Sequence, residues 1–139
     1  MSGRADLYRS VVLEHGKRPR NVGALGGATH AAEGDNPLCG DALRVEVERR
    51  GDVLVALAFA GEGCILATAS ASLMTEILRG ARVAEARRLA VAMEAFCAEG
   101  RGDADALGPL AGFADVYRHP ARVACALLPW RTLARALDD

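Results

Sequence analysis

The segment DALRVEVERRGDVLVALAFAGEGCILATASASLMTEIL (residues 41–78) carries the clearest structural pattern in the chain. From residue 43 to residue 48 apolar and charged side chains alternate, which is the period of a half-buried β-strand. Gly51–Asp52 is typical of a hairpin turn, and Val53–Ala60 is expected to form the partner strand. After the Gly-Glu-Gly break that follows, apolar residues recur at spacings of three and four, which predicts a helix over Cys64–Arg79. The segment therefore predicts a β-hairpin followed directly by a helix.

The flanking sequence adds further helices and one more strand. The expected elements are a helix over 4–15, a loop over 16–27, a strand over Thr29–Gly34, a turn over 35–41, a helix over Val83–Glu99, a loop with a short helix over Gly100–Gly112, and a helix over Ala121–Leu137. In an unbroken helix Pro129 could not donate a backbone hydrogen bond, and its ring would clash with the carbonyl of Cys125. The last helix is therefore expected to bend after Cys125 or to hold Cys125 near an end. We predict a single α+β domain over residues 1–139: a small antiparallel sheet of about three strands, with helices packed on one face.

The bulk composition excludes several classes of partner. The chain has 139 residues, which suits one domain, and a formal net charge of −1, which provides no strong field for nucleic acid or an anionic membrane. No signal peptide is visible, and no apolar run approaches the ~20 residues of a membrane helix, so a cytoplasmic location is expected. Thiols stay reduced in that compartment. The four cysteines are therefore expected to be ligands, reactive thiols or core residues rather than disulfides.

Cys39-Gly40-Asp41 is the strongest local signal for chemistry. Gly40 permits the backbone to fold back, so that the thiol and the carboxylate can point toward one centre. Thiolates are the ligands that zinc and iron–sulfur clusters prefer, and a carboxylate oxygen can complete a tetrahedral zinc site. The tripeptide taken alone is more typical of an ordinary turn that holds one partly buried cysteine.

Two further cysteines lie in settings that suit a ligand or a nucleophile. Cys64 comes where a strand ends and a helix begins, so unpaired amides and the helix dipole should favour its thiolate, although the preceding glycines could simply form a turn. Cys125 lies on the last helix, three residues after Arg122, whose cation could support a thiolate or a persulfide; the alternative is a core cysteine. Cys97 follows Phe96 on an apolar helix face and is interpreted as a core residue.

Taken together, four stretches resemble the IscU/SufU/NifU family of iron–sulfur cluster assembly proteins. They span Leu7 to Trp130, nearly the whole chain, and read LYRSVVLEHGKRPRNVG, NPLCGD, GEGCILATASASLMTEIL and RVACALLPW. Asn-Pro-x-Cys-Gly-Asp followed by Gly-x-Gly-Cys and a run of small hydroxylated residues is a specific combination. The family's three cysteines correspond to Cys39, Cys64 and Cys125, and its metal-site aspartate corresponds to Asp41.

Within that family the sequence looks most like the SufU branch. About sixty residues separate Cys64 from Cys125, which is longer than is usual in the IscU branch. Ala124 stands where the IscU branch carries a histidine ligand, and residues 119–123 replace that branch's Leu-Pro-Pro-Val-Lys chaperone motif. Arg122 matches a basic residue that SufU proteins tend to have.

The resemblance implies a zinc ion held by Cys39, Asp41, Cys64 and Cys125, and a role as sulfur acceptor or relay. A cysteine desulfurase would be the partner, and Cys39 is the expected acceptor because its glycine-flanked turn can move, with Arg122 supporting the thiolate or persulfide. The alternative is a non-enzymatic scaffold on which a transient [2Fe–2S] cluster, or iron, is assembled and passed to apo-proteins or downstream assembly factors. A third hypothesis is a plain zinc-stabilised interaction domain.

Overall fold

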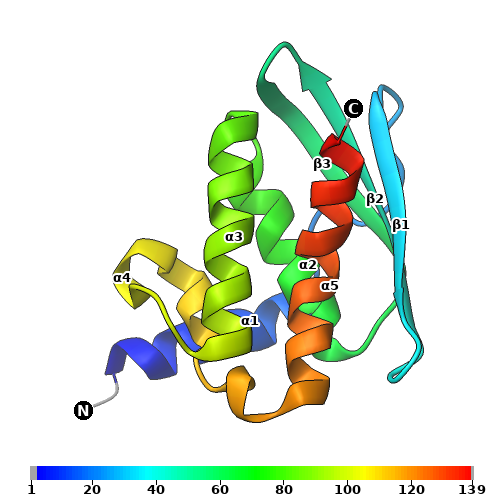
Figure 1. The fold of residues 1–139 in the computed structure, drawn as a ribbon. Helices are drawn as coiled ribbons and strands as arrows, with labels where there is room; N and C mark the ends of the chain where they lie inside the picture. Colours follow the sequence, from blue (N-terminus) through cyan, green and yellow to red (C-terminus); the bar gives the residue numbers. More distant parts are fainter. Residues whose placement is uncertain (1–2, 139) are drawn as a thin grey trace.

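The computed structural model describes residues 3–138. Within that range the elements are, in chain order, α1 (Gly3–Lys17), β1 (His30–Asn36), β2 (Asp41–Arg50), β3 (Val53–Glu62), α2 (Ile65–Leu78), α3 (Val83–Glu99), α4 (Ala104–Leu107), the 3-10 helices η1 (Gly108–Phe113) and η2 (Val116–Arg118), and α5 (Pro120–Leu137). The predicted α+β class is confirmed: the three strands form one antiparallel sheet, and the helices gather on one of its faces (Figure 1).

The sheet has the order β1-β2-β3, with both neighbouring pairs antiparallel. Along β2 every second side chain from Asp41 to Val47 is buried, as the alternating sequence pattern predicts. The register pairs Asn36 with Asp41 at the β1–β2 turn, and Ala42 with Glu62 at the end of β3. One end of the sheet therefore holds both the β1–β2 turn and the exit from β3.

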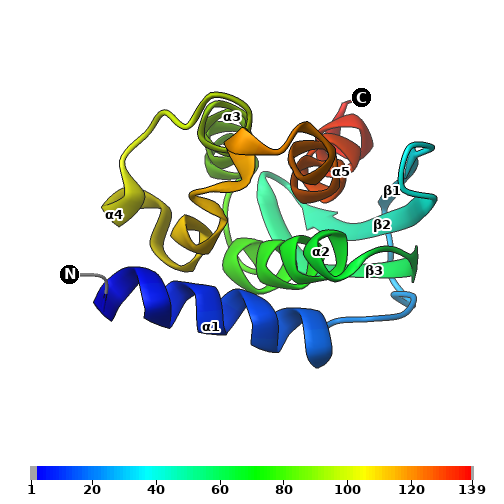
Figure 2. The same cartoon turned by 90° about the horizontal axis from the view of Figure 1, so that it is seen from below.

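The helices cover the sheet in two layers. Helices α2 and α5 pack against the sheet, and α1 lies across α2 on its far side (Figure 2). Helix α3 packs beside α5. The largest fully buried side chains come from both the sheet and the helices: Trp130, Phe113, Leu54, Met74, Leu78, Met93, Leu110, Leu127, Leu133, Leu137, Val45 and Val47. None of the helices in the described part of the chain is long and apolar enough to cross a bilayer.

Several predicted boundaries were wrong by a few residues. Helix α1 continues through Gly16, and the first strand is His30–Asn36 rather than Thr29–Gly34. Helix α5 is assigned without a break from Pro120 to Leu137, so Cys125 lies well inside it, and the helix continues past Pro129. Helix α5 packs against both the sheet and helices α2 and α3, and Pro129 is buried there.

A buried histidine ties α1 to α2. His15 Nδ1 shares a hydrogen bond of 2.7 Å with Ser72 Oγ, which also accepts from the Arg20 backbone N at 2.8 Å. Nε2 of His15 lies 3.4 Å from a carboxylate oxygen of Glu76. Burial lowers the pKa of His15, and so does Arg20, against the opposing effects of Glu76 and Glu14. Burial of the ring therefore favours the neutral imidazole.

Candidate metal and sulfur site

Three segments that are distant in sequence converge at one end of the sheet. The β1–β2 turn carries Cys39, and Asp41 is the first residue of β2. The pairing of Ala42 with Glu62 brings the start of β2 beside the exit from β3, where Cys64 precedes α2. Helix α5 packs along β1 and contributes Cys125 (Figure 1). The sheet register and the packing of α5 thus assemble the site.

Cys39, Asp41 and Cys125 each place one ligand atom within 4.8 Å of the other two. The two sulfurs are 3.5 Å apart, with the Cys125 thiol donating to Cys39 Sγ. Their surroundings differ: Cys39 is exposed, whereas Cys125 is 3% exposed. One thiol therefore faces solvent, and the other lies directly behind it.

Asp41 joins the cluster to the fourth predicted ligand. It is 3% exposed, and its Oδ1 accepts a hydrogen bond of 2.9 Å from the Cys64 backbone N. Among the described residues, Asp41 Oδ2 is buried and has no hydrogen-bond partner. Such an orphaned carboxylate oxygen is costly without a compensating ligand. A carboxylate that lies within 4.8 Å of two sulfurs and keeps one buried oxygen unpaired fits a metal ion.

Cys64 caps the N-terminus of α2, as its position after the strand suggested. Its Sγ accepts a hydrogen bond of 3.4 Å from the Ala67 backbone N, and its conformation is extended. The thiol also interacts with Cys125, although it stands outside the three-atom group formed by Cys39, Asp41 and Cys125. The structure thus brings three of the predicted ligands together and places the fourth beside them.

The protein environment by itself disfavours a thiolate at Cys125. Burial raises the pKa of the Cys125 thiol well above its ordinary value, and the neighbouring side chains of Cys64, Cys39 and Asp41 raise it further. A cation bound between these groups would reverse that preference, because a metal holds coordinating thiols deprotonated. The donor set of thiols plus one carboxylate suits zinc or an iron–sulfur cluster.

Two residues outside the predicted ligand set hold Cys125 and its helix in place by hydrogen bonds. Asn36 is 6% exposed, and its side-chain amide donates to Cys125 Sγ at 3.7 Å. Ser70 Oγ donates to the carbonyl of Ala126 at 2.6 Å and accepts from Trp130 Nε1 at 3.1 Å. The motif around Cys39 includes Asn36, and the run of small hydroxylated residues in α2 includes Ser70. Both residues therefore lie in motifs that the sequence shows, but the sequence does not show their hydrogen-bond partners.

Arg122, Cys97 and Ala124 are not part of the group formed by Cys39, Asp41 and Cys125. Arg122 is exposed in the first turn of α5 and lines a hollow of about 280 Å³ against α1 and η1. It is not among the groups that shift the pKa of Cys125, so its supporting role stays a prediction. Cys97 is fully buried, and burial raises its pKa to about 12, in agreement with a core residue. Ala124 is half-buried on α5 and offers no ligand atom.

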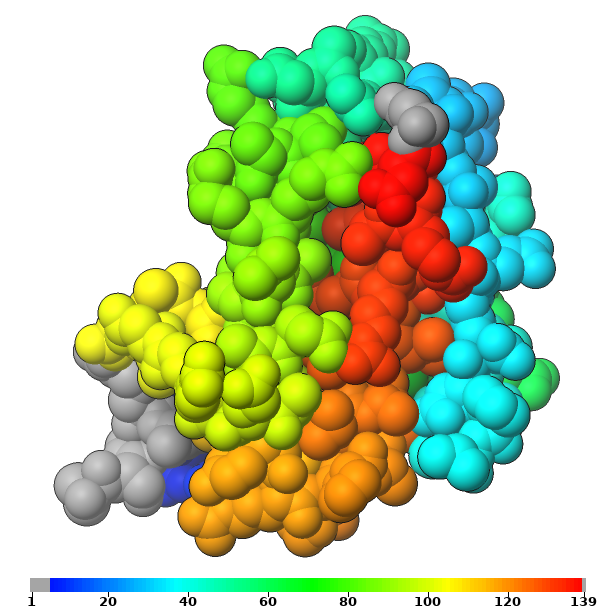
Figure 3. Space-filling model, viewed as in Figure 1, coloured from blue at the N-terminus to red at the C-terminus, as the bar shows by residue number. Residues whose placement is uncertain are grey.

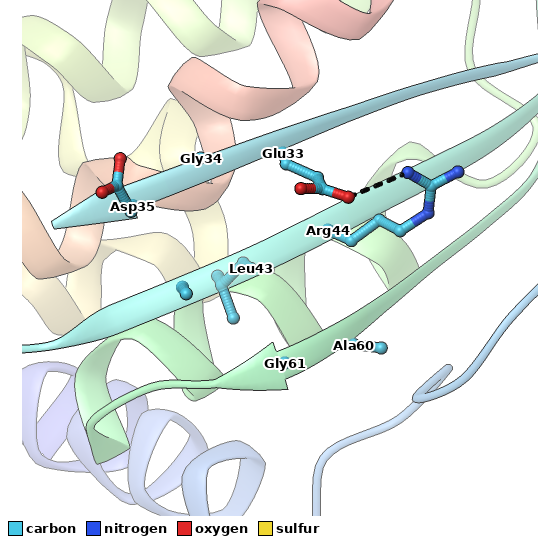
Figure 4. A pocket seen from close by; sticks show the side chains of 8 residues that line it. Glu33, Gly34, Asp35, Leu43, Arg44, Ala60 and Gly61 are labelled. Carbon is cyan, nitrogen blue, oxygen red and sulfur yellow. Dashed lines mark hydrogen bonds and ion pairs between the residues drawn. The ribbon is translucent and has the colours of Figure 1, made fainter.

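Other hollows contain none of the clustered thiols. Figure 4 shows one of about 530 Å³ on the exposed face of the sheet, where Glu33 and Arg44 form an ion pair of 3.3 Å across β1 and β2. A groove of about 510 Å³ runs between α3 and α5 (Figure 3). Neither hollow is lined by a cysteine.

Comparison with known proteins agrees with this geometry. Residues 7–126 match the family described as the NifU-like N terminal domain. The zinc-dependent sulfurtransferase SufU of Bacillus subtilis is 33% identical over 94% of this chain and 89% of its own length. The iron–sulfur cluster assembly scaffold protein IscU of Streptococcus pyogenes is 36% identical over 94% of this chain and 82% of its own.

Solved structures show the same fold. The crystal structure of FiSufU from Fervidobacterium islandicum AW-1, described as an iron–sulfur cluster assembly scaffold protein for the SUF system, superposes with a TM-score of 0.87 at 33% identity. The match covers 98% of this chain and 100% of that one. The NifU-like N-terminal protein from Brucella abortus superposes with a TM-score of 0.84 at 26% identity, covering 95% and 92%. The chain belongs to the NifU-like N-terminal domain family of iron–sulfur cluster assembly proteins.

Proposed function

We propose that the protein acts in iron–sulfur cluster assembly as a zinc-binding sulfur acceptor, which takes persulfide sulfur from a cysteine desulfurase. The observation that carries this proposal is the exposed Cys39 thiol, 3.5 Å from the buried Cys125 thiol and beside an unpaired Asp41 oxygen. The similarity to the zinc-dependent sulfurtransferase SufU supports the same assignment.

Cys39, Asp41, Cys64 and Cys125 would hold the zinc. The orphaned Asp41 Oδ2 and the raised pKa of Cys125 both describe a site that is unfavourable until a cation binds. Zinc would keep the coordinating sulfurs as thiolates at neutral pH, and its binding free energy would add to the stability of the fold. Asp41 also fixes the backbone of Cys64, so the carboxylate sets the spacing between the β2 and α2 ligands.

Cys39 is the residue that a partner can reach. Its turn projects from the sheet, Gly40 has a φ of +73°, and Leu38 next to it is 85% exposed. In the transfer, the Cys39 thiolate attacks the outer sulfur of the desulfurase persulfide. The sulfur–sulfur bond of the donor breaks, its cysteine leaves as a thiolate, and Cys39 becomes a persulfide. Arg122 would support the negative charge of the incoming sulfur from the first turn of α5.

Sulfur loading tests this assignment directly. The protein is incubated anaerobically with a cysteine desulfurase and free cysteine, and its intact mass is measured without reductant. We expect a gain of one sulfur atom on the wild type and on Cys97→Ser, whose thiol is buried away from the site, and no gain on Cys39→Ser. Normal sulfur loading of Cys39→Ser would refute the role of Cys39. Zinc content of protein purified without added metal tests the metal assignment separately.

The second candidate is a scaffold for a transient [2Fe–2S] cluster, and the similarity to IscU scaffold proteins favours it. The same four residues would serve as ligands, because Ala124 offers no ligand atom. Anaerobic addition of ferrous iron and sulfide distinguishes the candidates. Cluster absorbance followed by transfer to an apo-protein supports the scaffold, whereas unchanged zinc content and no cluster supports the sulfur acceptor.

A further inference from the structure

We propose that Cys125 is a resolving thiol when no metal occupies the site: it attacks the persulfide on Cys39, forms a Cys39–Cys125 disulfide and releases the transferred sulfur as hydrogen sulfide. This inference rests on the proposed function, in which Cys39 carries the sulfur. It gives the two clustered thiols different tasks, with the outer one accepting and the inner one reducing. The observation behind it is that the two sulfurs lie 3.5 Å apart, one exposed and the other buried.

The geometry suits a direct reaction between these two sulfurs. A disulfide bond is about 2.05 Å long, so the sulfurs need to approach by roughly 1.5 Å. Cys39 can supply that movement, because it lies in the exposed turn between β1 and β2. A Cβ added to the neighbouring Gly40 would meet no atom within 4 Å, so the turn is not packed against anything on that side. Cys125 is held in helix α5, where Asn36 also contacts its sulfur.

The chemistry balances without an added oxidant. Because burial disfavours a free thiolate at Cys125, its proton is transferred in the same step in which its sulfur attacks the inner sulfur of the Cys39 persulfide, and the bond between the inner and outer sulfurs breaks. The outer sulfur leaves with that electron pair and takes up the thiol proton of Cys125, so the products are one disulfide and one hydrogen sulfide. A dithiol reductant then returns the disulfide to two thiols.

The other two cysteines are less suited to the task. Cys64 Sγ is held by the Ala67 backbone N at the start of α2, and the backbone N of Cys64 is held by Asp41. It stands outside the group of ligand atoms that lie within 4.8 Å of one another. Cys97 is fully buried on α3, away from the turn. The structure therefore singles out Cys125 as the partner of Cys39.

The sulfur accepted by Cys39 can then react in either of two ways. A second protein that reaches the exposed turn can take the persulfide sulfur from Cys39 intact. Without such an acceptor, Cys125 converts the same sulfur to sulfide inside the site. Sulfide is the form in which sulfur enters an iron–sulfur cluster, so the resolving step would connect sulfur acceptance to cluster assembly.

The test uses metal-free protein loaded with inorganic polysulfide, which bypasses the desulfurase. After desalting, released sulfide is measured with a fluorescent probe, and the cysteine linkages are mapped by mass spectrometry of peptides under non-reducing conditions. In the wild type and in Cys97→Ser we expect sulfide release together with a Cys39–Cys125 link. In Cys125→Ser we expect a Cys39 persulfide whose lifetime is at least tenfold longer.

Two results would overturn the inference: an equally long-lived persulfide in the wild type and in Cys125→Ser, or a Cys39–Cys64 link in place of the expected one. The wild-type linkage map does not depend on the folding of any variant. A separate desulfurase reaction distinguishes the two proposals. Resolution after polysulfide loading, with no loading by desulfurase, would refute the sulfur-acceptor function while the resolving chemistry stands.

Discussion

Replacing Ser70 is expected to destabilise the packing of α5, the helix that carries Cys125, against α2. It is fully buried on α2, donates to the carbonyl of Ala126 at 2.6 Å and accepts from Trp130 Nε1 at 3.1 Å. In Ser70→Ala the indole N–H is left buried without this acceptor, because Trp130 is only 1% exposed. Helix α5 then loses its polar attachment to α2 beside Cys125.

The magnitude follows from these two bonds. Stranding a buried donor costs about 1–3 kcal/mol, and losing the bond to the Ala126 carbonyl costs about 0.5–1.5 kcal/mol more. We therefore expect Ser70→Ala to lower the free energy of unfolding by about 1.5–4.5 kcal/mol. Denaturant titration in the presence of a chelator measures this value without a contribution from bound metal. Ser10→Ala, at an exposed position on α1, is the matched control and should stay within about 0.5 kcal/mol of the wild type.

A double-mutant cycle isolates the stranded indole. In a Trp130→Phe background no N–H remains to be left unpaired, so Ser70→Ala should cost about 1–2 kcal/mol less than it does in the wild type. A loss below about 0.5 kcal/mol for Ser70→Ala in the wild type would refute the reasoning. So would strictly additive effects of the two substitutions, since the hydrogen bond would then contribute nothing.

Three further outcomes are expected. Gly61→Ala should destabilise the fold by about 2 kcal/mol more than Gly23→Ala in denaturant titrations. Both glycines have a φ of +127°, but of the two only Gly61 would place an added Cβ against a backbone oxygen, that of Ala42, at 2.1 Å. Equal losses of stability would show that the surrounding backbone relieves the clash. Burial lowers the pKa of His15, so its contribution to stability is complete above about pH 6.5 and is lost as the pH falls through the folded-state pKa. In denaturant titrations at several pH values, the free energy of unfolding should depend less on pH in His15→Gln than in the wild type. Parallel pH profiles of the two proteins would contradict this. Burial raises the pKa of Cys97 to about 12. In metal-free native protein at about pH 8, iodoacetamide should therefore modify the exposed Cys39 and leave Cys97 unmodified, which peptide mass spectrometry measures. Equal labelling of the two cysteines would mean that the core opens.

Most of the secondary structure could be predicted from local patterns. The alternation in residues 43–48 and the change to helical spacing after Gly63 both appear in the structure as β2 and α2. The errors lie at element ends. Backbone pairing extends β3 through Gly61 and Glu62, which local composition marks as a break, because the partner strand supplies the hydrogen bonds.

The chemical identity of the site was also present in the sequence. A thiol and a carboxylate flanking Gly40, a thiol at a strand-to-helix junction, and a third thiol on the last helix are residue types whose chemistry does not depend on the fold. The family resemblance then related them to one another. What no local pattern contained was the hydrogen bond from Cys64 N to Asp41, or the bond from Asn36 to Cys125.

The unequal character of the thiols depends on burial, and burial is a property of the assembled molecule. Cys39 and Cys125 are separated by 85 intervening residues, yet the register of the β1–β2 turn and the packing of α5 along β1 place their sulfurs 3.5 Å apart. The same packing leaves one thiol in solvent and removes the other from it. Sequence therefore specifies which donor atoms are available, through residue type and local backbone conformation. Their distances, their exposure and the raised pKa of Cys125 arise only when distant segments pack together and exclude water.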